Sequence, residues 1–314
     1  MKAQQCSRYN NLRVWRCFNR YDQRPQCFRF YSTTASQYQY RPLASLEHVE
    51  LDHFRQAYFI PEHPILLPRR HFQTLPALTK WFSSSPSRLN TIYLSQHGAD
   101  AMVPLELTQF STNTDIGANE LDFRQFHAPL SLFLEWMSTA ESLESQKTRL
   151  YLAQCQLLDL PQTLRDDLPA PDLVKQVGKG DIYDTNVWIG YPPTYTPLHR
   201  DPNPNLFVQL AGRKMVRLLP PSEGQKVFGA VRRQMGKSAG REAAAMRGDE
   251  MMQGEERFLL EKAVWHEATV GSTGPLGFEA SLEAGDGMFI PRGWWHSIKG
   301  LEECVTASVN WWFR

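Results

Sequence analysis

The stretch Thr196-Pro197-Leu198-His199-Arg200-Asp201 places a histidine and a carboxylate two positions apart, and Gly293-Trp294-Trp295-His296 supplies a second histidine far downstream. Side chains at positions i and i+2 of a β-strand point to the same face of the sheet. His199 and Asp201 would therefore share one face if their segment is extended. Two imidazoles and one carboxylate on one side of a metal ion form the facial triad of non-haem Fe(II) sites. We predict that His199, Asp201 and His296 are ligands of one metal ion.

Alternatives to this metal site exist within the same residues. Among nine histidines, a His-x-Asp triplet can arise by chance and mark only a solvated strand end. His-Arg-Asp also opens the catalytic loop of protein kinases, but that loop needs an Asn where this chain has Leu206, and no Gly-rich loop or Asp-Phe-Gly motif is present. The prolines before His199 favour extended or turn backbone over helix. The surrounding strands decide between the alternatives.

Several strands are expected on both sides of the triplet. Leu206–Leu210 and Lys214–Leu219 would form a hairpin around Ala211-Gly212, and Thr306–Phe313 alternates between two faces. On the return strand Lys214 shares a face with apolar residues. A lysine inside a barrel is costly without an anionic partner, so a dicarboxylate co-substrate would explain it. The alternative is that Lys214, just after a turn, reaches water.

As a set, these motifs resemble the JmjC/cupin-like Fe(II)- and 2-oxoglutarate-dependent oxygenases over roughly residues 45–314. The pattern is most similar to the asparaginyl hydroxylase that inhibits hypoxia-inducible factor and to small JmjC-only hydroxylases. The resemblance implies a mainly β fold with helical decoration, a double-stranded β-helix of the jelly-roll or cupin type. It also implies the cofactors Fe(II), 2-oxoglutarate as co-substrate, and O2.

The family's functional residues can be matched position by position to this sequence. His199, Asp201 and His296 match the catalytic iron ligands, and Lys214 matches the basic residue that pairs with the distal carboxylate of 2-oxoglutarate. The other co-substrate residues that the resemblance implies are Tyr151, Thr196, Asn205 and Asn310. Three tryptophans are candidates for a water-poor pocket wall, with ordinary core packing as the alternative: Trp188, Trp294 and Trp312.

By analogy with the family, we expect an oxygenase that hydroxylates a protein side chain. A tRNA nucleoside hydroxylase of the same fold is an alternative within the enzyme class. A catalytically silent cupin-like binding module is an alternative from another class. The complete set of metal ligands argues against it, because a silent relative would be free to lose one of them. No apolar run is long enough for a membrane-spanning helix, so no membrane insertion is expected.

Residues 1–31 differ from the rest of the chain. They contain seven basic residues and one acidic residue, which is typical of a mitochondrial transit peptide, and a disordered basic arm is the alternative. We expect cleavage after Tyr31 and a mitochondrial matrix location, with cytoplasm or nucleus otherwise. Without this segment the formal net charge changes from +1 to −5, which argues against broad nucleic-acid binding.

Residues 32–314 are expected to form a single oxygenase domain with a charged insertion at about 222–280. The insertion is rich in Arg, Glu, Ala and Met, with several Gly. We expect loosely packed helix and loop there, either a mobile surface insertion or a lid over the substrate. Cys155 and Cys304 lack the spacing of a thiolate metal site or a disulfide framework. Helices are expected at 45–60 and at Pro129–Thr139.

Overall fold

The computed structural model describes residues 40–84, 87–111, 120–140, 148–238, 251–266, 276–301 and 304–314. The segment 1–31, for which a transit peptide is predicted, lies outside the described residues. The centre of the described structure is a barrel of eight strands: β8 (Ile182–Gly190), β9 (Tyr195–Arg200), β10 (Asn205–Ala211), β11 (Arg213–Leu219), β12 (Gly277–Leu282), β13 (Gly287–Ile290), β14 (Trp295–Leu301) and β15 (Thr306–Phe313).

The order of these strands defines the fold. One sheet has the order β12-β11-β14-β9 and the facing sheet has the order β13-β10-β15-β8, so the chain crosses repeatedly from one sheet to the other. Neighbouring barrel strands are antiparallel. This arrangement is the double-stranded β-helix, or jelly roll, and it confirms the predicted fold class.

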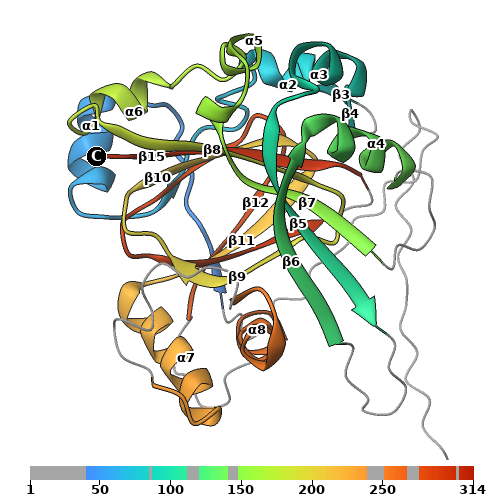
Figure 1. Ribbon diagram of the computed structural model, residues 1–314. Coiled ribbons are helices and arrows are strands. Elements are labelled where there is room, and N and C mark those ends of the chain that lie inside the picture. The colour runs from blue at the N-terminus through green and yellow to red at the C-terminus, as the bar shows by residue number, and fades with distance from the viewer. Residues whose placement is uncertain are drawn as a thin grey trace, which may run out of the picture. The chain divides into compact units, whose positions relative to one another are not determined.

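Further strands extend both sheets. Strand β1 (Tyr40–Pro42) pairs in parallel with β12, and β2 (Ile65–Leu66) pairs with β13. On the far side of β8, the larger sheet continues through β7 (Thr148–Gln156), β5 (Met102–Ser111) and β6 (Glu120–Pro129). These three strands project beyond the barrel in Figure 1. A separate hairpin consists of β3 (Phe82–Ser84) and β4 (Ser87–Leu89).

Helices cover the outer faces of both sheets (Figure 1). Those that pack against the larger sheet are α1 (Leu51–Phe54), η1 (Arg55–Phe59), α2 (Pro76–Lys80), α3 (Thr91–Gly98), α4 (Leu130–Ala140), η2 (Leu157–Asp159), α5 (Gln162–Arg165) and α6 (Asp172–Gln176). The helix expected at Pro129–Thr139 is therefore confirmed as α4, whereas the one expected at 45–60 begins only at Leu51. No helix in the described ranges is long and apolar enough to cross a membrane.

The expectation of loose packing in the insertion at 222–280 is wrong for its described part. Helices α7 (Pro221–Gln234), α8 (Gly254–Glu261) and η5 (Lys262–His266) pack on the smaller sheet, and Phe228, Leu260 and Val264 are fully buried. Their cluster includes Trp295, and a Cβ on Gly224 would lie only 2.1 Å from its ring. Residues 277–282 belong to β12, so the insertion ends before this barrel strand.

Truncating Phe228 tests this packing. Phe228→Ala should lower the free energy of unfolding by about 3–5 kcal/mol, because it leaves a cavity in a fully buried cluster. Chemical denaturation of both proteins measures the difference. Phe258→Ala is the matched control on α8, since that side chain is 63 % exposed, and it should change stability by less than about 0.5 kcal/mol. Equal effects of the two substitutions would mean that α7 is not packed on the barrel.

Candidate metal centre

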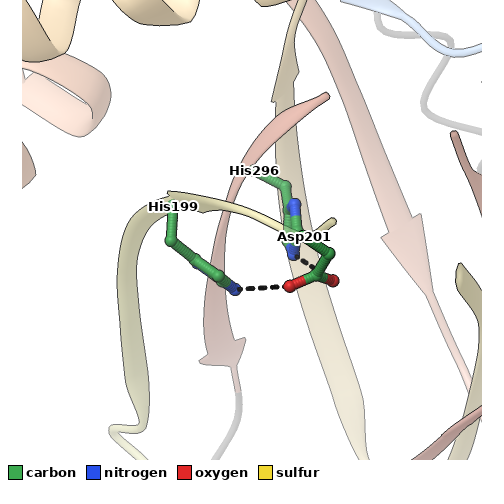
Figure 2. Close-up of side chains that lie close together, drawn as sticks. All are labelled: His199, Asp201 and His296. Carbon is green, nitrogen blue, oxygen red and sulfur yellow. Dashed lines mark ion pairs between the residues drawn. The ribbon is translucent and has the colours of Figure 1, made fainter. Parts of the chain in front are cut away.

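The pairing of β9 with β14 brings the two predicted histidine ligands together. In this antiparallel pair His199 lies directly opposite His296, and their ring centroids are 4.1 Å apart. Asp201 follows the last residue of β9, and its side chain points to the same place (Figure 2). One ligand atom from each of the three side chains lies within 4.8 Å of the others. These three side chains thus form a compact group that can hold one metal ion.

Hydrogen bonds fix the ring orientation of both histidines. His199 Nδ1 lies 2.8 Å from the Pro197 carbonyl oxygen, and His296 Nδ1 lies 3.2 Å from that of Trp294. A carbonyl can only accept, so each Nδ1 carries the proton and each Nε2 keeps its lone pair. The two Nε2 atoms lie 3.9 and 3.6 Å from the carboxylate oxygens of Asp201. Burial lowers the pKa of His296, which favours the neutral form that binds metals.

The carboxylate of Asp201 is oriented by two neighbours. Its Oδ2 accepts hydrogen bonds from Asn205 Nδ2 and from Trp312 Nε1, both at 3.1 Å. Partners of this kind hold a ligating carboxylate in place. Asn205 and Trp312 are directly opposite each other in the β10–β15 pair, so the sheet register positions both donors.

Lys214 is buried inside the barrel with only 3 % of its surface exposed, so the alternative that it reaches water is wrong. Its Nζ donates to Ser308 Oγ at 2.7 Å and to the Tyr151 hydroxyl at 3.4 Å, and it lies 5.7 Å from the Phe207 ring centroid. Burial lowers the pKa of Lys214 to about 7. A buried amine among neutral groups is suited to binding an anion.

All eight sequence-predicted site residues line one inner pocket of about 40 Å³. Two of them have buried polar atoms without a hydrogen-bond partner in the described structure, Asn205 Oδ1 and Asn310 Nδ2. Buried polar groups normally have partners. Together with the cation of Lys214, these atoms fit an oxygen-rich anion such as 2-oxoglutarate next to the metal ligands. The three ligand side chains themselves fit Fe(II).

An outer cleft of about 230 Å³ adjoins the inner pocket. His199 and Asp201 line both spaces, as do Tyr151 and Thr196. Strand β7 and the insertion helix α8 both contribute residues to its lining. A substrate in this cleft would therefore reach the metal ligands.

Comparison with known proteins agrees with the fold. Residues 52–314 match the family model of the cupin-like domain, so the chain belongs to this family. The chain is 29 % identical over 272 residues to "Lysine-specific demethylase JMJ30" of Arabidopsis thaliana, which covers 84 % of this chain and 53 % of the relative. It is 25 % identical over 265 residues to "Lysine-specific demethylase 8" of Xenopus tropicalis, covering 84 % and 51 %.

A third relative is "Jumonji C domain-containing protein 5" of Drosophila melanogaster, 25 % identical over 276 residues, covering 87 % of this chain and 60 % of the relative. The chain thus spans between half and three fifths of the length of these relatives. The match confirms the resemblance to JmjC/cupin-type oxygenases, a family that uses Fe(II), 2-oxoglutarate and O2.

The structure adds one site residue that the sequence did not single out, and it places two of the three candidate tryptophans. Ser308 accepts the hydrogen bond of Lys214, and the alternation of the last strand, which puts it on the face of Asn310, was the available signal. Trp188 lines the inner pocket and donates to Asn310 Oδ1 at 2.8 Å. Trp294 does not line it, because its indole packs in the apolar cluster with Leu43 and Leu282.

The lowered pKa of Lys214 predicts how the free energy of unfolding depends on pH. Between about pH 7 and pH 10, the unfolded chain keeps the Lys214 proton and the folded chain loses it. The free energy of unfolding should therefore rise with pH by about 1.4 kcal/mol per pH unit from this group. The Lys214→Met variant should lack this rise of the free energy of unfolding with pH. It should also be more stable than wild type near neutral pH, as measured by urea unfolding of ligand-free protein.

A control separates this effect from the general titration of the chain. Lys226→Met changes a lysine whose side chain is 72 % exposed, and its pH profile should run parallel to that of the wild type. If the Lys214→Met profile is also parallel to the wild-type profile, Lys214 keeps its proton in the folded protein.

Proposed function

We propose that this chain is an Fe(II)- and 2-oxoglutarate-dependent oxygenase that hydroxylates a protein side chain. The observation that supports it best is the group of His199, Asp201 and His296 beside the buried Lys214, in one pocket. A silent binding module has no need to keep a buried, uncompensated lysine, because burying such a cation costs free energy.

Each pocket residue has a role in this proposal. The two Nε2 atoms and the carboxylate of Asp201 would hold Fe(II), while Lys214, Thr196 and Tyr151 would bind the distal carboxylate of 2-oxoglutarate. The unpaired amide atoms of Asn205 and Asn310 would bind its metal-proximal end. When bound, Fe(II) and 2-oxoglutarate supply the oxidation of a substrate C–H bond by O2, with release of succinate and carbon dioxide. The indoles of Trp188 and Trp312 line the pocket and would limit the access of water to it.

The substrate class rests on the relatives. Two of them are named lysine-specific demethylases, which supports a protein substrate. Demethylation is the second candidate that these names favour. It shares its first step with hydroxylation, because a hydroxylated N-methyl carbon leaves as formaldehyde. Mass spectrometry of captured substrate separates the two: hydroxylation adds one oxygen atom, and demethylation removes one CH2 unit.

The activity is tested by co-substrate turnover. Protein reconstituted with Fe(II) should convert 2-oxoglutarate to succinate, slowly in the absence of substrate. His199→Ala and Asp201→Ala should lose iron binding and turnover, because each removes one of three ligands. The exposed His53 provides a matched control, and His53→Ala should retain both. Wild-type protein that binds iron without binding or converting 2-oxoglutarate would show the chain to be a silent binding module.

The same assay tests the anchor of the co-substrate. Lys214→Ala should weaken 2-oxoglutarate binding by about 3–5 kcal/mol, the usual cost of removing one partner of a buried charged pair. The KM for 2-oxoglutarate should therefore rise by more than about 100-fold, while iron binding should be retained. An unchanged KM would mean that another group binds the distal carboxylate.

We also propose that residues 1–31 direct the protein to the mitochondrial matrix. The support is their composition, with seven basic residues and one acidic residue. A reporter fused to residues 1–40 should enter mitochondria and be shortened near Tyr31, as detected by N-terminal sequencing of the matrix product. A variant with Arg8, Arg13 and Arg16 replaced by Gln should stay outside. Full-length reporter in cytosol or nucleus would contradict the proposal.

A further inference from the structure

Asn310 lies on the middle one of three neighbouring barrel strands, β10, β15 and β8 (Figure 1). In the strand register it is directly opposite Phe207 of β10 and Asn186 of β8. Asn310 and Phe207 both line the inner pocket. Directly opposite residues share one face of a sheet, so Asn186 also points to the barrel interior, where it is fully buried. The Asn310 amide is therefore within the space that a ligand of the inner pocket would occupy.

One hydrogen bond fixes the orientation of this amide. Trp188 Nε1 donates to Asn310 Oδ1 at 2.8 Å. An indole N–H can only donate, so it faces the amide oxygen and not the amide nitrogen. The opposite orientation would direct two donors at each other and leave both without an acceptor. Nδ2 is therefore the atom of the Asn310 amide that is left for a ligand.

The other neighbours of Asn310 do not select this orientation. Its Nδ2 is buried and has no hydrogen-bond partner in the described structure. Asn186 is likewise without a partner at both amide atoms, and because it offers a donor and an acceptor it suits either orientation of Asn310. Buried donors normally have an acceptor. The hydrogen bond from Trp188 thus decides which atom of Asn310 remains open.

Asn205, the second amide with an open atom in the pocket, is held the other way round. Its Nδ2 donates to Asp201 Oδ2 at 3.1 Å, so its open atom is Oδ1, which can only accept. A carboxylate also only accepts, so Asn205 can contact one only through a water molecule that donates to both. Of the two open amide atoms, Asn310 Nδ2 is the one that can bind a carboxylate directly.

We propose that Trp188 is a positioning residue, whose indole N–H holds the Asn310 amide so that Nδ2 donates to the carboxylate at the metal-proximal end of 2-oxoglutarate. This inference rests on the proposed oxygenase function and assigns a residue to the same site. Trp188 lines both the inner pocket and the outer cleft, and its ring centroid lies 6.4 Å from that of Tyr151. The donor is in place before the co-substrate binds, so binding does not require the amide to reorient.

The test measures the affinity for 2-oxoglutarate by isothermal titration calorimetry, with the full chain loaded with Mn(II) in place of Fe(II) to prevent turnover. Trp188→Phe keeps an aromatic ring beside Tyr151 and removes the N–H. It should weaken binding about tenfold, a difference of about 1.4 kcal/mol. Asn310→Ala removes the donor itself and should weaken binding at least as much. Because Trp188 acts through Asn310, Trp188→Phe should have no further effect in the Asn310→Ala background.

A rescue variant and a matched control separate positioning from folding. Trp188→His places an N–H at the same position of a five-membered ring, so it should bind 2-oxoglutarate more tightly than Trp188→Phe. Trp81→Phe is the control, because Trp81 is buried, donates its Nε1 to Asp167 at 2.9 Å and lines neither the inner pocket nor the outer cleft. It should lower the free energy of unfolding and leave the affinity for 2-oxoglutarate unchanged.

A further variant needs no change at Trp188, so the proposal can be tested even if the Trp188 variants do not fold. Asn310→Asp keeps the size of the side chain and an oxygen for Trp188, but it replaces the donor by an anionic oxygen. It should weaken 2-oxoglutarate binding more than Asn310→Ala does. Affinity equal to that of the wild type would mean that Nδ2 does not contact the co-substrate, and the proposal would be wrong.

The remaining outcomes distinguish this role from the proposed function. If wild-type protein binds 2-oxoglutarate and Trp188→Phe binds it equally well, the positioning role is wrong and the oxygenase proposal stands. If the effects of Trp188→Phe and Asn310→Ala add in the double variant, Trp188 acts independently of Asn310, and the positioning role is again overturned. If wild-type protein loaded with Mn(II) does not bind 2-oxoglutarate, both proposals fail.

Discussion

The antiparallel pairing of β9 with β14 is the constraint on which the site depends. It places His199 opposite His296 although the two are far apart in the sequence, and it leaves Asp201 just beyond the strand end. A shift of one residue in this register would move one imidazole to the opposite face of the sheet. The register is held from both sides, because β14 also pairs with β11 along its length.

The barrel interior has two chemically different parts. Val216, Leu218 and Met288 belong to a buried apolar cluster, whereas Lys214 and several amides line the inner pocket, and Phe207 belongs to both. The alternation of β11 places Lys214 on the same face as Val216 and Leu218, so one strand joins the two environments. Burial of the lysine and of unpaired amide atoms costs stability. The same groups would bind the co-substrate, and the cost is consistent with a functional role.

The sequence predicted the parts that depend on local pattern. The i, i+2 spacing placed His199 and Asp201 together, and the alternation of Thr306–Phe313 gave the limits of β15. The packing of α7 was missed because its many charged residues obscure the buried stripe of Gly224, Phe228 and Val231. The outer cleft is lined by residues of both β7 and α8, which are far apart in the sequence, so the sequence alone could not predict that they line one cleft.

The central claim is that His199, Asp201 and His296 hold one metal ion through Nε2, Nε2 and a carboxylate oxygen. Anomalous diffraction from a crystal loaded with Fe(II) under anaerobic conditions tests it most directly. The account predicts one anomalous peak per chain, within bonding distance of these three atoms, and its loss in Asp201→Ala crystals. A peak bound elsewhere, or none at this position in fully loaded crystals, would contradict it.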